Sequence, residues 1–172
     1  MDVLMIVLRA LHIALGVLWA GWTFALALFI NPAVAASGPA GGQFMQALAG
    51  KTNLVKIMTA APLIIIATGL WMLWIVSGGF ESSYLTSTHG MTITAGSVLG
   101  IIAAIYGLGF VRPLAKRMGT LGAEVAASGA PPTQEQQAEL GALRQKLLGA
   151  AKNVAALLAI TVILMAIARY VY

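Results

Sequence analysis

The sequence predicts an all-α integral membrane protein, a four-helix bundle whose third and fourth helices extend into a cytoplasmic helical hairpin. The first observation is composition, because 60% of the 172 residues are hydrophobic and only 9% are charged, which is too apolar for a soluble domain. The second is that four segments are long and apolar enough to cross a bilayer. These spans are residues 3–30, 54–77, 86–111 and 149–172 of a single membrane domain, residues 1–172.

The first span is expected to be a retained helix rather than a cleaved signal peptide. It opens with Asp2 instead of a basic cluster, and its apolar run of about 27 residues is longer than a signal peptide needs. Asn31 and Pro32 are expected to end this helix, and the Gly78-Gly79 pair is expected to end the second. Proline and paired glycines are typical helix breakers.

The connection between the third and fourth spans, residues 112–148, carries helical signals of its own. Apolar residues recur at helical spacing on both sides of an expected turn at Ser128–Pro132. They are Leu114, Met118, Leu121 and Val125 before the turn, and Leu140, Leu143 and Leu147 after it. Thr133 and Gln136 stand in capping-box positions just after two prolines, which marks the start of a helix. We therefore expect a short antiparallel helical hairpin.

The basic residues predict the orientation of the bundle. Eight of the ten lie with the connections at 31–53 and 112–148: Lys51, Lys56, Arg112, Lys116, Arg117, Arg144, Lys146 and Lys152. Cytoplasmic loops are rich in lysine and arginine, so both termini are expected outside a bacterial-type inner (plasma) membrane. The net charge of +5 reflects this bias, since the sequence has no nucleic-acid motif. An outer aromatic belt is expected from Trp71, Trp74, Tyr84, Tyr170 and Tyr172.

One stripe of the first span is polar, although the rest of this helix suits lipid. In LRALHIALGVLWAGW, residues 8–22, Arg9 and His12 lie one helical turn apart. They share a helix face with Gly16 and Trp19. Burying an ionisable pair in a bilayer costs free energy unless something pairs with it. This stripe is therefore a candidate functional site.

A second histidine and a second arginine are expected near the same side of the membrane. His89 opens the third span on a small-residue face that includes Gly96, and such a face lets another helix or a flat ligand come close. Two imidazoles from facing helices are a natural way to hold haem iron, and b-type haem needs no cysteine, which this chain lacks. Arg9 and Arg169 are placed to pair with the haem propionates.

The sequence thus predicts haem b as a cofactor, with His12 and His89 as the candidate metal ligands. The candidate cofactor-binding residues are Arg9, Arg169, Gly16, Trp19 and Gly96. Simpler roles stay open, because arginines near helix ends extend to the interface, His89 fits an interfacial loop, and tryptophans fit a belt or packing role. Counted along the helices, His89 lies ~6 Å further out than His12, and His12 is the better supported ligand.

Other chemistries have less support. His89 and Met91 form an H-x-M pair that suits copper, but the eight methionines are scattered along the chain, so copper transport is a minor alternative. The sequence contains no Ser-His-Asp set and no phosphate-binding glycine loop. No acidic residue lies within a span, which argues against a carboxylate proton relay.

Short motifs along most of the chain resemble two families of membrane proteins, the HemJ-type protoporphyrinogen oxidases and the copper-resistance D proteins. LHIALGVLWAGW, residues 11–22, resembles the first helix of both families. LVKIMTAAPLIIIATGLWML, residues 54–73, resembles the second helix of the HemJ-type enzymes. THGMTITAG in the third span and KNVAALLAITVILMAIARYV in the fourth are similar to the corresponding segments.

The resemblance implies a four-helix membrane protein that binds haem b, with His12 in the place of the family's haem-ligating histidine. Met91 stands where the family has a lysine, and Val154 stands where it has a glutamate. The closing Lys-Pro of the family is Arg169-Tyr170 here. These departures favour a divergent relative over a porphyrinogen oxidase, and they make His89 the natural replacement ligand.

The expected function is therefore redox or electron transfer by haem b near the outer face, with quinone or another membrane redox complex as the candidate partner. The alternative is a haem-free structural or accessory subunit of a larger membrane complex. In that case the hairpin at 112–148 is the docking surface. Both functions require contact with the lipid bilayer, and both are compatible with an oligomer.

Overall fold

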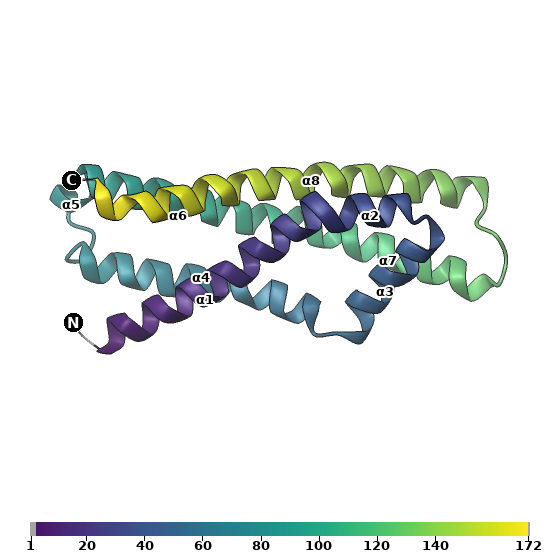
Figure 1. The fold of residues 1–172 in the computed structure, drawn as a ribbon, viewed down its shortest axis with the longest axis horizontal. Helices are drawn as coiled ribbons and strands as arrows, with labels where there is room; N and C mark the ends of the chain where they lie inside the picture. The colour runs from purple at the N-terminus through teal and green to yellow at the C-terminus, as the bar shows by residue number, and fades with distance from the viewer. Residues whose placement is uncertain (1–2, 172) are drawn as a thin grey trace.

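The computed structural model describes residues 3–171, and the regular elements in this range are all helical (Figure 1). The α-helices are α1 (Val3–Ala25), α2 (Asn31–Ala36), α3 (Pro39–Lys51), α4 (Leu54–Val76), α5 (Ser82–Leu85), α6 (Thr88–Tyr106), α7 (Arg112–Ser128) and α8 (Gln134–Ile167). Two π-helical segments, η1 (Leu26–Ile30) and η2 (Gly107–Val111), and the 3-10 segment η3 (Ala168–Tyr170) join or extend them. The predicted all-α class is confirmed.

Within residues 3–171, four helical stretches are long and apolar enough to cross a membrane. They are Val3–Ala36, Leu54–Val76, Thr88–Ser128 and Gln134–Tyr170. The span predicted at 54–77 agrees with α4 to within one residue. Gly78 and Gly79 follow it with φ angles of 65° and 89°, which a helix cannot contain and which glycine adopts readily. The predicted stop after the second span is therefore confirmed.

The predicted helix end at Asn31-Pro32 is wrong, because the helix continues through both residues to Ala36. The continuation depends on η1, in which the Asn31 N–H donates to the Leu26 carbonyl, five residues back. Proline lacks an N–H, and its ring collides with the carbonyl four residues back in a regular α-helix. A wider π turn just before Pro32 moves that carbonyl away. The segment 31–53 is accordingly helical rather than an irregular connection.

The same arrangement recurs where α6 becomes α7. The Arg112 N–H donates to the Gly107 carbonyl at the end of η2, and Pro113 follows immediately. Within the described residues, each of the two π-helical segments, both five residues long, thus precedes a proline in a helix that continues through it. Both segments also pack against α8.

The four long helices form two pairs. α6 packs along α8, and α1 packs against α4, which it crosses in Figure 1. The start of α1, the short α5 and the end of α8 lie together at one end of the molecule, which we call the α5 end (Figure 1). α3 and the turn between α7 and α8 lie toward the opposite end, which we call the α3 end.

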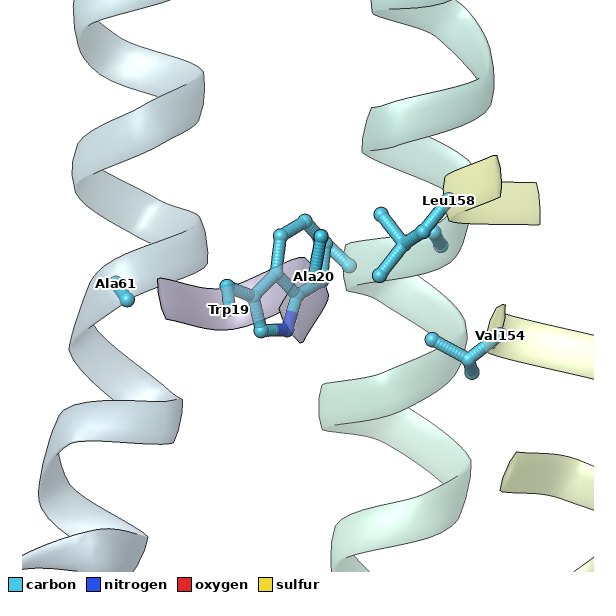
Figure 2. Packing of buried hydrophobic residues seen from close by; sticks show 7 residues of the cluster. Trp19, Ala20, Ala61, Val154 and Leu158 are labelled. Atoms are coloured by element: carbon cyan, nitrogen blue, oxygen red, sulfur yellow. The ribbon is translucent and has the colours of Figure 1, made fainter. Parts of the chain in front are cut away.

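The two pairs meet in a cluster of buried residues around Trp19, which we call the Trp19 junction. Its members are Trp19, Ala20, Ala61, Ala103, Ala104, Val154 and Leu158. Figure 2 shows the Trp19 indole between the helix that carries Ala61 and the side chains of Val154 and Leu158. Ala61 and Ala103 are at most 2% exposed. Small residues let helices approach closely, so the alanines make room for one large side chain that touches several helices.

Away from the junction, the long helices present large apolar side chains outward. Val17 on α1 is 68% exposed and Ile105 on α6 is 66% exposed. In water such surfaces aggregate, whereas in a bilayer they contact acyl chains at no cost. The four apolar helices are therefore suited to direct contact with lipid.

At the α3 end, α7 and α8 pack side by side beyond the apolar part of the chain. Gly129 ends α7 in a left-handed conformation with a φ of 62°, as is common at helix ends. The predicted capping box is confirmed, since Thr133 N–H donates to Gln136 Oε1 at 3.0 Å and Gln136 N–H donates to Thr133 Oγ1 at 3.2 Å. An Arg117–Glu139 ion pair at 2.8 Å joins the two helices on their exposed side.

We predict that Trp19→Ala lowers the free energy of unfolding by about 3–5 kcal/mol, because the alanines around the indole cannot fill the cavity left behind. Denaturant or thermal unfolding in detergent, followed by circular dichroism, measures this loss. Trp74→Ala is the matched control, because Trp74 is 54% exposed. An equal loss in the two variants contradicts the central role of the Trp19 junction.

Candidate functional site

His12 is fixed against α4 by two hydrogen bonds. Its Nδ1 lies 3.0 Å from the Ile65 carbonyl oxygen and 3.2 Å from Thr68 Oγ1. A carbonyl oxygen only accepts, so Nδ1 carries the hydrogen in this arrangement. The neutral imidazole then has an unprotonated Nε2 with a lone pair. His12 thus has the tautomer that a metal-ligating histidine needs at Nε2.

Thr68 and Gly69 form the surface of α4 that receives this imidazole. The Thr68 hydroxyl is almost fully buried and donates to the Ile64 carbonyl at 2.8 Å, which leaves its lone pairs available to His12. A Cβ atom added at Gly69 would lie 2.8 Å from His12 Cε1, closer than atoms can approach. Glycine at position 69 therefore allows the ring to lie directly on the α4 backbone.

Ile65, Thr68 and Gly69 were not predicted from the sequence to belong to the site. One signal was present, because glycine inside an apolar helix costs about 1 kcal/mol relative to alanine and so marks a close approach by another group. Thr68 beside it supplies the only hydroxyl of that turn. Which group approaches Gly69 depends on the pairing of α1 with α4, and periodicity does not determine that pairing.

His89 makes a similar bond in the other helix pair. Its Nδ1 lies 2.7 Å from the Ala168 carbonyl oxygen, in the segment that follows α8. The same reasoning places the hydrogen on Nδ1 and leaves Nε2 unprotonated. The ring of Tyr84 packs edge-on against His89, with the ring centroids 5.8 Å apart. His89 therefore fixes the start of α6 to the end of α8.

Tyr84 departs from the predicted aromatic belt. Its hydroxyl is buried and has no hydrogen-bond partner within residues 3–171, and burial raises the pKa of this phenol above its usual value. Trp71, Trp74 and Tyr170 are 51%, 54% and 68% exposed, as belt residues are. Tyr172 lies outside the described residues.

The two histidines are held by different helix pairs and at different distances from the Trp19 junction. Counted along α1 from Trp19, His12 lies ~10 Å toward the α5 end. Counted along α6 from Ala103, His89 lies ~21 Å in the same direction. The offset of ~10 Å is larger than the offset expected from the sequence. His12 and His89 thus attach helices to one another at two separate places in this structure.

The small-residue face of α6 is occupied by α8. A Cβ atom added at Gly96 would lie 3.2 Å from Met165 Cε and 3.3 Å from Leu164 Cβ. At Gly100 the nearest atom would be Thr161 Cγ2, at 3.4 Å. The sequence allowed either a helix or a flat ligand here, and the structure places a helix on this face.

The remaining candidate residues divide between the interior and the surface. Trp19 belongs to the buried junction, where packing accounts for it. A Cβ atom at Gly16 would meet nothing within 4 Å, so this position faces open space. Arg9 and Arg169 are exposed, and the Arg169 guanidinium lies 4.9 Å from the centroid of the Tyr170 ring. Within residues 3–171 neither arginine forms an ion pair.

A metal ion held by protein ligands alone has little support in the described residues. Nowhere in that range do three His, Cys, Asp or Glu side chains gather around one point, whereas protein-only sites need three or four ligands. His89 and Met91 also diverge, because His89 contacts α8 while Met91 lines a shallow apolar groove of about 500 Å³ on α6. The minor copper alternative therefore gains nothing from the geometry.

Comparison with protein-family models, with curated proteins and with solved structures gave no match for this chain. The α5 end offers two imidazoles with unprotonated Nε2 atoms and two exposed guanidinium groups.

We predict opposite effects for two Gly→Ala variants. Gly69→Ala lowers the free energy of unfolding by about 1–2 kcal/mol, because the clash with His12 outweighs the gain in helix propensity. Gly16→Ala raises it by up to ~1 kcal/mol, because helix propensity improves without a clash. Unfolding in detergent measures both effects. Stabilisation by Gly69→Ala would rule out close contact between the ring and α4.

Proposed function

We propose that the protein is a multi-pass protein of a bacterial inner membrane that binds haem b through His12 and works in redox or electron transfer near the outer face. The observation that carries the proposal is the bond from His12 Nδ1–H to the Ile65 carbonyl. Metal-ligating histidines almost always donate their second ring N–H to a carbonyl, carboxylate or water, which fixes the tautomer and the ring orientation.

The scarcity of other ligands favours a porphyrin over a bare ion. Four of the ligands of haem iron are porphyrin nitrogens, so the protein needs to supply only one or two imidazoles. Within the described residues, clusters of three metal-ligating side chains are absent, and single imidazoles with an available Nε2 are present. Bound haem would supply one-electron redox chemistry at its iron.

The surroundings of His12 suit an amphipathic ligand of this kind. Arg9 lies one helical turn further toward the α5 end and is exposed, so its guanidinium can pair with a carboxylate at the aqueous boundary. The apolar outward faces of α1 and α4 provide a water-poor environment for the macrocycle. Thr68 would orient the imidazole through its contact with Nδ1.

His89 has a different role in this proposal. The offset of ~10 Å between the two histidines favours a ligand set in which His12 binds iron and His89 fixes α6 to α8 through Ala168. Arg169 stands next to Ala168 and offers a second guanidinium at the same end. Quinone is the candidate electron partner because it dissolves in the lipid that the exposed apolar side chains of α1 and α4 are suited to contact.

A haem-free structural or accessory subunit remains the second candidate, and one observation favours it. Both histidines already attach one helix to another through a hydrogen bond. This structural role alone accounts for a histidine at each position. The hairpin of α7 and α8 would then be the surface that docks on the larger complex. A spectrum of the purified protein separates the two candidates.

We predict that the protein purified after expression with ample haem shows a Soret band and a reducible α-band. His12→Ala is expected to abolish or severely weaken both bands, because bound haem would lose its protein ligand. His89→Ala is expected to keep the ligand signature, and a high-spin shift would instead identify His89 as a second ligand. A colourless, well-folded protein that is unaffected by His12→Ala contradicts the haem proposal.

Two finer changes test the surroundings of the iron. Thr68→Val removes one acceptor from His12 Nδ1 and leaves the Ile65 carbonyl in place. With one hydrogen bond fewer at Nδ1, the imidazole donates less electron density to the iron through Nε2. The reduction potential of the haem is therefore expected to rise while the Soret band persists. Arg9→Ala and Arg169→Ala are expected to lower haem occupancy or shift the potential without changing the ligand signature.

The orientation is a separate part of the proposal, based on the basic residues at the α3 end. A reporter that is active only outside the cytoplasm is expected to be active when it is fused after Tyr172. The same reporter is expected to be inactive when it is inserted at Gly129. The opposite result would reverse the topology and place the histidines near the cytoplasm. Reporter activity at both positions in whole cells is the measurement.

A further inference from the structure

The basic residues of the α3 end have few partners within the protein. Arg117 pairs with Glu139, and Arg144 donates to the Val34 carbonyl at 3.2 Å. No other ion pair occurs in the described part of the chain. The remaining basic residues of this end are all exposed: Lys51, Lys56, Arg112, Lys116, Lys146 and Lys152.

Three of these cations lie within ~12 Å of the Trp19 junction on its α3 side, on three different helices. Counted from the Trp19 junction toward the α3 end, Lys152 lies ~3 Å, Lys56 ~8 Å and Arg112 ~12 Å away. The first residue of α4, Leu54, lies ~10 Å from the junction on the same scale. The three cations therefore lie between the Trp19 junction and a level just beyond the first residue of α4. We call them the basic belt.

The basic belt has no acidic neighbours along its helices. Glu124, on the same continuous helix as Arg112, lies ~18 Å further from the junction, and Glu135 lies ~26 Å beyond Lys152 along α8. Glu139 is already paired with Arg117. The charge of the belt is thus uncompensated by protein at its own level.

The cations of the basic belt are exposed and come from helices on two sides of the Trp19 junction. On each helix the cation is exposed while the junction residue is buried, and Figure 2 places the helix that carries Ala61 on the other side of Trp19 from Val154 and Leu158. A small free anion needs cations that converge on one point. A layer of headgroups around the protein meets outward cations on every side, and lysine and arginine side chains extend toward such a layer.

We propose that the basic belt binds the headgroups of anionic phospholipids in the leaflet at the α3 end. The phosphates would supply the counter-charges that the protein lacks at this level. Each lysine or arginine near an anionic membrane surface contributes an attraction of about 1 kcal/mol, which corresponds to about a five-fold change in affinity. The inference is independent of haem binding.

The test compares the protein in nanodiscs of phosphatidylcholine with and without phosphatidylglycerol. Phosphatidylglycerol is expected to raise the thermal unfolding midpoint, and native mass spectrometry is expected to show it retained in preference to phosphatidylcholine. Lys56→Gln, Arg112→Gln and Lys152→Gln are each expected to lower the apparent affinity about five-fold, and the triple variant by about a hundred-fold. High salt is expected to weaken the preference.

Arg117→Gln is the matched control, because it removes the same charge from a residue whose counter-ion lies in the protein. It is expected to leave the lipid preference unchanged within two-fold. A wild-type protein with equal stability and equal retention in both bilayers overturns the proposal, whatever the variants do. So does an Arg117→Gln effect as large as that of the belt variants. If the triple variant does not fold, the three single variants decide the outcome.

Discussion

The arrangement of the molecule depends on a single level at which four apolar helices come together around Trp19. Within lipid, helices gain nothing by hiding apolar surface from one another, so they associate through close packing and hydrogen bonds. The Trp19 junction provides the packing, because alanines from α4 and α6 leave space for one indole. Elsewhere the helices separate into two pairs, and each pair needs its own means of attachment.

The two histidines provide that attachment toward the α5 end. His12 joins α1 to the Ile65 carbonyl of α4, and His89 joins α6 to the Ala168 carbonyl after α8. In both bonds the acceptor is a backbone carbonyl oxygen. Such an oxygen has two lone pairs, so it can accept from a histidine as well as from its own helix. The same bonds determine which ring nitrogen stays unprotonated. The bond that attaches one helix to another is thus also the bond that determines the tautomer of the ring.

The sequence predicted the features that depend on local chemistry. The second span, the glycine stop at residues 78–79 and the capping box at Thr133 all follow from a few adjacent residues. The helix end at Asn31 was predicted wrongly, because the preceding turn widens to accommodate Pro32. The partners of His12 were not found, because Ile65 and Thr68 are brought to it only by the packing of α1 on α4. His12 itself was predicted as a candidate because an ionisable group in an apolar helix is conspicuous without any tertiary information.

The two π-helical segments have a consequence for how the chain can vary. Each widened turn changes the rotational phase of the helix that follows it, so the sides of α2 and α7 that face α8 are not determined by the pattern of α1 and α6. The rotation of α2 and α7 about their own axes can therefore change without a change in the spans that precede them. Substitutions that re-phase or exchange these helices can accumulate while the alanine-lined space around Trp19 stays intact. Divergence between relatives should consequently concentrate beyond the two prolines.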